Sequence, residues 1–168
     1  MNDRDVLESL PPTTLPLRPE AAARPRRMAS RPALLGWLLF DWACQPFFTL
    51  VTTFVFAPFF AAALAPDPVT GQSLWGYATA CAGLVLAFLS PVLGSIADAT
   101  GPKKPWIAAC GLVLFAASFA LWFAAPGMPY AIPVALVGFG IGTVAVEVAA
   151  VFNNAMIPHL VPPERLGR

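Results

Sequence analysis

The sequence is poor in charged residues and in the residues that usually carry catalytic or metal chemistry. Only 11% of its 168 residues are charged, against roughly 25% in an average soluble domain, so polar side chains are too few to cover a water-exposed surface. Its three cysteines have no CxxC spacing, and His159 is the only histidine. This pattern offers no metal site, cofactor site or catalytic residue, so we expect no enzyme. The net charge of +1 also gives no reason to expect nucleic acid as a partner.

Long apolar runs make up most of the chain. Hydrophobic residues account for 58% of it, which excludes disorder over most of the length. A transmembrane helix needs about 20 apolar residues to cross ~30 Å of hydrocarbon, and several stretches reach that length. The sequence therefore predicts an all-α membrane protein with four transmembrane helices. We place these helices at residues 33–65, 73–97, 106–125 and 131–157.

The basic residues predict the orientation of these helices. Residues 1–32 are rich in proline and arginine, and we expect them to form a disordered cytoplasmic tail. The connections 66–72 and 126–130 contain no lysine or arginine. The basic residues that follow the tail lie in the loop 98–105, which has two lysines, and in the C-terminal end 158–168, which has two arginines. The positive-inside rule then places both termini in the cytoplasm. We expect the protein in the plasma or inner membrane of the cell.

Two acids stand inside the apolar stretches: Asp41 in the first and Glu147 in the fourth. An acid near the centre of a membrane helix costs about 2.5–3.5 kcal/mol on insertion, and such residues usually face a cavity or a partner. At ~1.5 Å per residue, both lie roughly 12–15 Å from the cytoplasmic end. We interpret Asp41 and Glu147 as candidates for proton or ion coupling that line one aqueous cavity.

Other polar residues share a helix face with each acid. Candidate solute contacts are Gln45, Thr49 and Asn154, and Thr52, Gly140 and Thr143 extend the two stripes. Structural interpretations also remain open. Asp41 could cap a helix start, Glu147 could hydrogen-bond to a neighbouring helix, and a threonine often bonds back to its own helix.

The connection between the second and third helices combines small, acidic and basic residues. Its shortness predicts that these two helices are antiparallel neighbours. Asp98 stands at a helix C-terminus, where the helix dipole disfavours an anion, so we expect it to pair with Lys103, Lys104 or the N-terminus of another helix. Small residues repeat every three or four positions along the second and fourth helices and predict close helix packing.

This connection resembles the signature loop of the major facilitator superfamily, a gating element of secondary transporters. The matching residues are Gly94, Asp98, Gly101, Lys103 and Lys104, whereas Ala99 and Pro102 stand where that family usually has basic residues. The segment 40–47, FDWACQPF, resembles the branch related to fungal vacuolar amino-acid effluxers and similar bacterial permeases.

The resemblance implies an N-terminal portion of a two-half transporter of about twelve helices. Such a transporter would move a small solute, an amino acid being one candidate, by proton- or ion-coupled alternating access. Its cavity would be lined in this half by the first and fourth helices, and the loop would form the cytoplasmic gate. The expected partners are the solute, the lipid bilayer, and either the remaining helices or further copies of the chain. The alternatives are a truncated, non-transporting membrane protein and a small four-helix transporter that works as an oligomer.

Overall fold

The computed structural model describes residues 29–99 and 101–160, without the side chains of Asp98 and His159. Most of the predicted tail 1–32 and of the end 158–168 lies outside these residues. All regular structure within them is helical, which confirms the all-α class. Helices suit a membrane because they pair every backbone N–H and C=O within one segment. The spans long and apolar enough to cross a bilayer are Arg31–Leu64, Pro68–Ala97, Lys104–Leu121 and Ala131–Asn154.

The first span is a chain of four helical segments. These are α2 (Arg31–Pro46), the wider π-helical η1 (Phe47–Phe54), α3 (Phe56–Phe59) and η2 (Phe60–Leu64). Two prolines, Pro46 and Pro58, lie within α2 and α3. Proline has no N–H to donate and crowds the preceding turn, so a regular α-helix is interrupted near it. The backbone instead bonds five residues back at the ends of the wide turns, from Val55 N to Leu50 O and from Ala65 N to Phe60 O.

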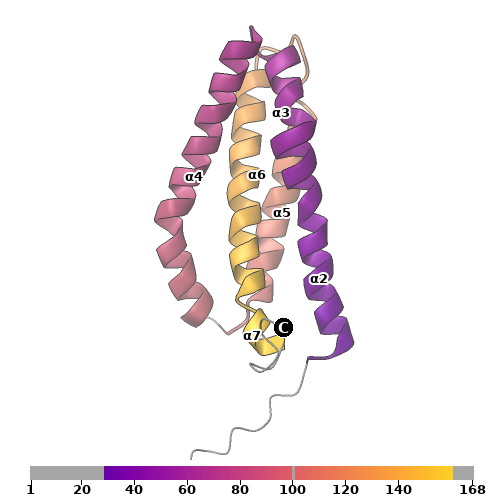
Figure 1. Cartoon of the computed structure of the whole chain (residues 1–168), viewed down its shortest axis with the longest axis vertical. Coiled ribbons are helices and arrows are strands. Elements are labelled where there is room, and N and C mark those ends of the chain that lie inside the picture. The colour runs from indigo at the N-terminus through magenta and orange to yellow at the C-terminus, as the bar shows by residue number, and fades with distance from the viewer. Residues whose placement is uncertain (1–28, 100, 161–168) are drawn as a thin grey trace, which may run out of the picture.

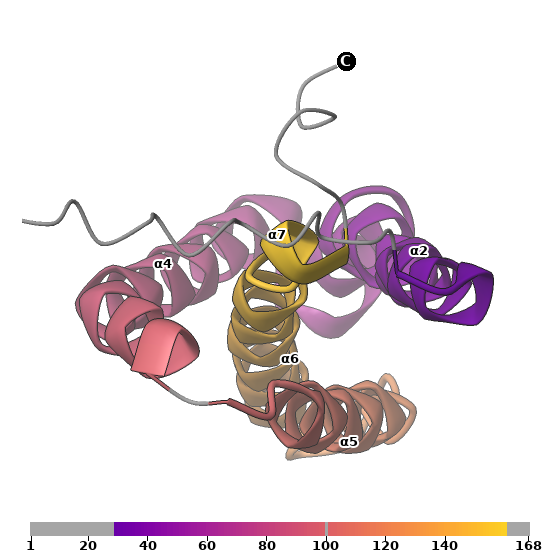
Figure 2. The same cartoon turned by 90° about the horizontal axis from the view of Figure 1, so that it is seen from below.

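The last long helix is the centre of the bundle. After α4 (Pro68–Ala99) and α5 (Lys104–Leu121) comes α6 (Ala131–Asn154), followed by the short α7 (Ile157–Leu160). Figures 1 and 2 show α6 with α4, α5 and α2 arranged around it. Small side chains on α6 let its neighbours approach closely, as in other membrane helix pairs. The buried small residues of α6 are Ala131, Ala135, Gly138, Gly142, Ala145 and Ala149.

The expectation that the second and third helices pack as neighbours is wrong. Both α4 and α5 pack along α6, but they share almost no contacts with each other. Figure 2 shows them on different sides of α6, joined by the loop between them. The reason is the shape of α6, whose small residues accept a neighbour on more than one face, whereas a short loop fixes only where two helices begin and end.

Aromatic stacking holds the ends of the bundle. Trp75 of α4 stacks on Phe139 of α6 with ring centroids 4.1 Å apart, and Phe60 of the first span lies 5.4 Å from Trp75. At the other end Trp106 of α5 stacks on Phe152 of α6 at 5.3 Å. The first cluster joins three of the four spans, so it fixes where they converge.

The small-residue stripe of α4 has no neighbour covering it among the described residues. Gly76, Ala80, Gly83 and Ala87 are all exposed. A Cβ built on Gly76 or Gly83 would meet nothing within 4 Å. The equivalent stripe of α6 is buried, so the same spacing of small residues leads to different packing on the two helices.

Candidate functional site

The polar residues predicted on the first span lie on α2 and η1. Asp41, Gln45 and Thr49 are all exposed, whereas Cys44 and Phe47 beside them are buried. Asp41 lies inside α2, which begins at Arg31 with Ser30 as its N-cap. The alternative interpretation, in which Asp41 caps a helix start, is therefore wrong. The structure gives its carboxylate no hydrogen bond or ion pair within the described residues.

The threonines next to this stripe bond to their own helix. Thr52 donates its hydroxyl to the Phe47 carbonyl at 3.4 Å, and Thr53 donates to Phe48 at 3.0 Å. Both bonds reach five residues back, because the wide turns of η1 place those carbonyls beneath the hydroxyls. On α6, Thr143 donates to Phe139 at 2.9 Å. These hydroxyls therefore donate hydrogen bonds to carbonyls of their own helices, which is common for threonine in membrane helices.

The polar residues of the fourth span are only partly covered. Glu147 and Thr143 are half-buried, and Asn154 is exposed. No described residue forms a hydrogen bond or an ion pair with the Glu147 carboxylate. The alternative in which Glu147 hydrogen-bonds to a neighbouring helix therefore finds no partner in the part of the chain that the structure describes.

Two contacts set the register between α2 and α6. The indole N–H of Trp37 donates to the Asn153 carbonyl at 2.9 Å. Further along, the Phe47 ring covers Gly142, where a built Cβ would lie 2.7 Å from Phe47 Cζ. The helices therefore run antiparallel, and Asp41, four residues after Trp37, lies level with Ala149, four residues before Asn153. Glu147 is two residues further along, or ~3 Å along the axis, so the two acids lie at nearly one depth.

Both acids also border the same side of the bundle. Successive residues of an α-helix advance by about 100°. On α6, Gly142 and Val146 face α2, and Gly138 and Phe152 face α5. Glu147 lies on the opposite side of the α2-facing residues from those that face α5. On α2, Asp41 lies on the other side of Trp37 from Phe40, which faces α5 across a small cavity. The first span and α6 share one side that is not covered by α5, and we call this side the open face. It carries Asp41, Gln45, Thr49, Thr143, Glu147 and Asn154.

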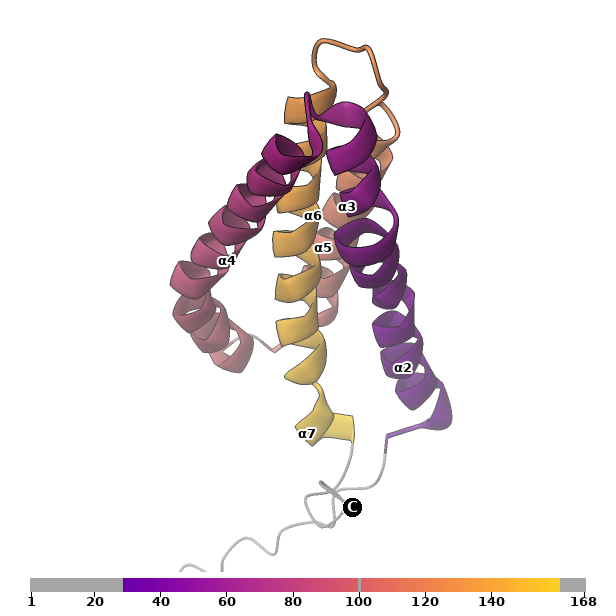
Figure 3. The ribbon, with the colours of Figure 1, turned by 45° about the horizontal axis from the view of Figure 1, so that its top comes forward.

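The open face is bordered by converging helices. Figure 3 shows the first span and α4 on either side of α6, with α3 close to α4 at the top and α2 apart from α4 at the bottom. The convergent end is where Phe60, Trp75 and Phe139 meet. The divergent end is where α2 and α5 begin, with Arg31, Lys103 and Lys104.

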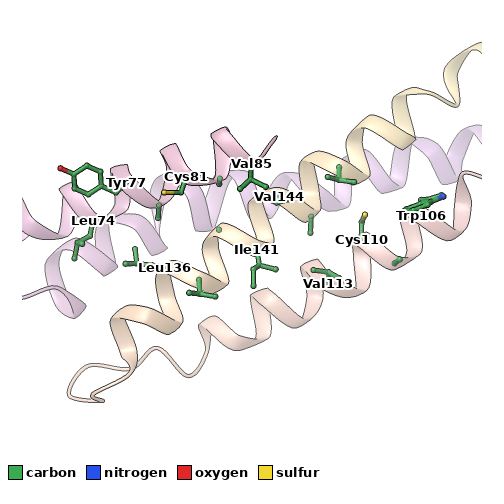
Figure 4. A pocket seen from close by; sticks show the side chains of 17 residues that line it. Leu74, Tyr77, Cys81, Val85, Trp106, Cys110, Val113, Leu136, Ile141 and Val144 are labelled. Carbon is green, nitrogen blue, oxygen red and sulfur yellow. The ribbon is translucent and has the colours of Figure 1, made fainter. Parts of the chain in front are cut away.

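A large cavity of the described residues lies elsewhere. It has a volume of about 740 Å³ and lies between α4, α5 and α6. Figure 4 shows its apolar walls, with Val85, Val113 and Ile141 among the labelled side chains. Gly140 is the one residue of the two predicted polar stripes that lines it. A cavity of this chemistry suits hydrocarbon and offers almost nothing to orient a polar solute.

The predicted gate loop is partly described. Lys103 donates its ammonium to the backbone carbonyl of Ala155 at 2.6 Å, just beyond the end of α6. The last carbonyls of a helix have no partner within it, and a cation there is favoured by the helix dipole. Lys104 is exposed, and Gly101 lies in the connection. Gly94 is half-buried with open space at its Cβ position. The Asp98 side chain, whose partner was predicted, lies outside the described residues.

Two residues that position the site were missed from the sequence. In the sequence, Trp37 is one of many apolar residues of the first span. The predicted solute contact on the fourth span is Asn154, not its neighbour Asn153. The structure buries Asn153 to 3% exposure and leaves Asn154 exposed. Helical phase was the available signal, because Asn153 falls on the same face as the small residue Gly142.

Comparison with known proteins adds independent observations. A family model described as Major Facilitator Superfamily matches residues 4–168. A Bacillus subtilis protein named "Uncharacterized MFS-type transporter YxiO" is 31% identical over 137 residues, which cover 79% of this chain and 31% of that protein. The chain thus spans about a third of the length of this curated relative. No solved structure matches the chain significantly.

Proposed function

This chain belongs to the major facilitator superfamily, and from that premise we propose that it forms part of a secondary transporter that moves a small solute by alternating access. The observation that carries the proposal is the placement of Asp41 and Glu147 at nearly one depth on the open face. Leaving two unpaired acids in hydrocarbon would be costly, so their position favours a water-filled path.

Within this proposal, the acids couple transport to a proton or another cation. Neither carboxylate has a hydrogen-bond or ion-pair partner in the described part of the chain, so each is available to a mobile cation. Gln45, Thr49 and Asn154 are the proposed solute contacts, because they share the open face and keep exposed polar groups. The likeness of segment 40–47 to the fungal vacuolar effluxer branch supports an amino acid as the first solute to test.

The proposed gate is the loop from Gly94 to Lys104. The bond from Lys103 to the Ala155 carbonyl ties this loop to the end of α6, the helix that carries Glu147. A change in the loop is therefore coupled mechanically to the helix of one proposed coupling acid. Asp98 and Gly101 belong to the same gate by resemblance to the family loop.

The proposed orientation places the termini in the cytoplasm of a plasma or inner membrane. It is supported by Arg31, Lys103 and Lys104 at one end of the bundle, whereas the other end has no lysine or arginine among the described residues. The uncovered α4 stripe supports packing against further helices or a second copy. The alternatives, a non-transporting membrane protein and a four-helix oligomeric transporter, differ from this proposal in activity and in assembled mass.

The test uses the complete reading frame that contains this sequence, in a background with Cys44, Cys81 and Cys110 replaced. We expect Asp41→Cys and Glu147→Cys to react with a membrane-impermeant maleimide. Leu39→Cys on α2 and Ile141→Cys on α6 are the controls, since both side chains are exposed but lie away from the open face. Equal labelling of all four positions, or of none, would contradict a water-filled path at the acids.

A transport assay tests coupling directly. Vesicles containing the protein are loaded with a mixture of labelled amino acids, and flux is measured with and without a proton gradient. We expect Glu147→Gln to abolish gradient-driven flux while membrane insertion persists. Undiminished flux in that variant would remove Glu147 from the mechanism, and a monomer with no flux of any amino acid would favour the non-transporting alternative.

A further inference from the structure

A second, smaller cavity lies between α2, α5 and α6 at the basic end of the bundle. Its volume is about 330 Å³, which is within the range of small-molecule sites. Trp37 and Phe40 form the wall on α2, Lys104 and Ile107 the wall on α5, and Asn153 and Met156 the wall at the end of α6. None of the predicted site residues on the open face lines it.

Asn153 gives this cavity an unused polar group. The residue is only 3% exposed, and its backbone carbonyl is taken by the Trp37 indole. Its side-chain amide has no hydrogen-bond partner among the described residues. No described side-chain nitrogen or oxygen is both sealed from open space and without a partner. The Asn153 carboxamide therefore still reaches open space, and the cavity that it lines is that space.

Lys104 lines the same cavity and supplies a positive charge. Lys104 is exposed and makes no hydrogen bond or ion pair in the described structure, whereas the ammonium of neighbouring Lys103 is held by the Ala155 carbonyl. Lys104 is also the first residue of α5, so the partial positive charge of the helix N-terminus adds to its own. No acidic residue among those that the structure describes lines the cavity. These groups together favour an anion that accepts hydrogen bonds.

The rest of the cavity is apolar and indicates what kind of anion fits. Trp37, Phe40, Ile107 and Met156 would contact hydrocarbon, and a small hydrated anion gains nothing from them. The cavity lies where three membrane spans begin or end, at the depth at which lipid headgroups meet the protein. Basic pockets between transmembrane helices at such a level bind lipid headgroups. An amphiphile with an anionic head matches both kinds of wall.

We propose that this cavity, between α2, α5 and α6, binds the headgroup phosphate of an anionic membrane lipid. The phosphate accepts hydrogen bonds from the Lys104 ammonium and the Asn153 amide, and the start of an acyl chain lies against Trp37 and Phe40. The same lipid would bridge the beginning of α2 and the end of α6. This site is distinct from the open face, and the proposal does not depend on which solute is carried.

Native mass spectrometry of the full protein in detergent measures retained lipid directly. With phosphatidylglycerol as the probe, we expect one tightly held molecule per chain and at least about tenfold weaker retention of phosphatidylcholine, because its choline cation offsets the phosphate charge and is repelled by Lys104. Lys104→Gln is expected to weaken phosphatidylglycerol retention by about tenfold, as is Asn153→Asp, which places a negative charge in a cavity of the same shape. Lys104 is exposed, so its variant reports on binding even if Asn153→Asp fails to fold.

Lys103→Gln is the matched control, because it removes the same charge from the same loop and Lys103 does not line the cavity. We expect retention within about twofold of wild type for this variant, the change expected of a solvent-screened charge that does not bond to the phosphate. An equal loss in Lys103→Gln and Lys104→Gln would overturn the proposal in favour of general attraction to the basic end. Displacement of the lipid by inorganic phosphate alone would also overturn it, since the site would then take the free anion.

Discussion

Trp37 of α2 donates its indole N–H to the backbone carbonyl of Asn153 on α6, at 2.9 Å. The two residues are 116 positions apart in the chain. This bond sets the antiparallel register that brings Asp41 and Glu147 to nearly the same depth. It also occupies the backbone oxygen of Asn153, a residue that lines the small cavity.

Replacing Trp37 with phenylalanine removes the donor while keeping a large ring. We expect Trp37→Phe to lower the free energy of unfolding by about 1 kcal/mol, the usual net contribution of one hydrogen bond. Thermal unfolding followed by circular dichroism in detergent measures the change. Trp42→Phe is the control, because Trp42 is 74% exposed. Equal effects of the two changes would mean that the bond adds no stability.

Gly142 lets Phe47 approach α6. A Cβ there would lie 2.7 Å from Phe47 Cζ, whereas at Gly140 it would meet nothing within 4 Å. We expect Gly142→Ala to destabilise the protein by about 1–3 kcal/mol through overpacking. Gly140→Ala on the same helix is expected to be neutral or slightly stabilising, because alanine favours helix. Thermal midpoints of the two variants compare these outcomes, and a neutral Gly142→Ala would show that Phe47 moves aside freely.

Asp67 caps the start of α4. Its Oδ1 accepts hydrogen bonds from the backbone N–H groups of Val69 and Thr70, each at 3.0 Å. Hydrogen bonds from the Thr70 side chain and backbone, together with that from Val69, lower the pKa of Asp67. The carboxylate therefore stabilises the folded chain above its unfolded pKa of ~3.9, and this contribution is lost as pH falls through the lower folded pKa.

We expect Asp67→Ala to be less stable than wild type at neutral pH and the gap to narrow as the solution is acidified below about pH 4. Unfolding midpoints measured across that range give the two curves. Asp67→Asn keeps a hydrogen-bond acceptor at the cap but has no charge that titrates. Its stability should therefore not show the loss on acidification that is expected for wild type. A gap that widens on acidification would contradict the assigned direction of the pKa shift.

Lys103 holds the end of α6 through the Ala155 carbonyl. We expect Lys103→Met to leave that carbonyl unpaired and to speed hydrogen exchange over the last turn of α6, by about fivefold to tenfold for a bond of ~1–1.4 kcal/mol. Exchange measured by mass spectrometry resolves the segment. Lys104→Met should leave exchange there unchanged, because its ammonium forms no hydrogen bond to the described residues of α6. Similar exchange rates over the last turn of α6 in both variants would mean that the loop does not stabilise the end of α6.

The helical class of this chain follows from composition, because runs of Leu, Phe, Val and Ala this long can satisfy their backbone in lipid only as helices. The depth of Asp41 and Glu147 also follows from counting residues along each span. Helix neighbours do not follow in the same way. The short loop after α4 suggested that α4 and α5 pack together, but loop length limits only the distance between two helix ends.

Spacing in the chain specified the spans, the depth of the acids and the two small-residue stripes. The three-dimensional packing decided which stripe became a contact. Gly138 and Gly142 on α6 meet Leu121 and Phe47, whereas Gly76 and Gly83 on α4 meet nothing. Packing likewise buried Asn153 rather than Asn154. Helical phase puts Asn153 on the same face as Gly142, but it does not determine which helix covers that face. Helix contact in lipid depends on the shapes of both surfaces, and each surface is complete only when residues far apart in the chain come together.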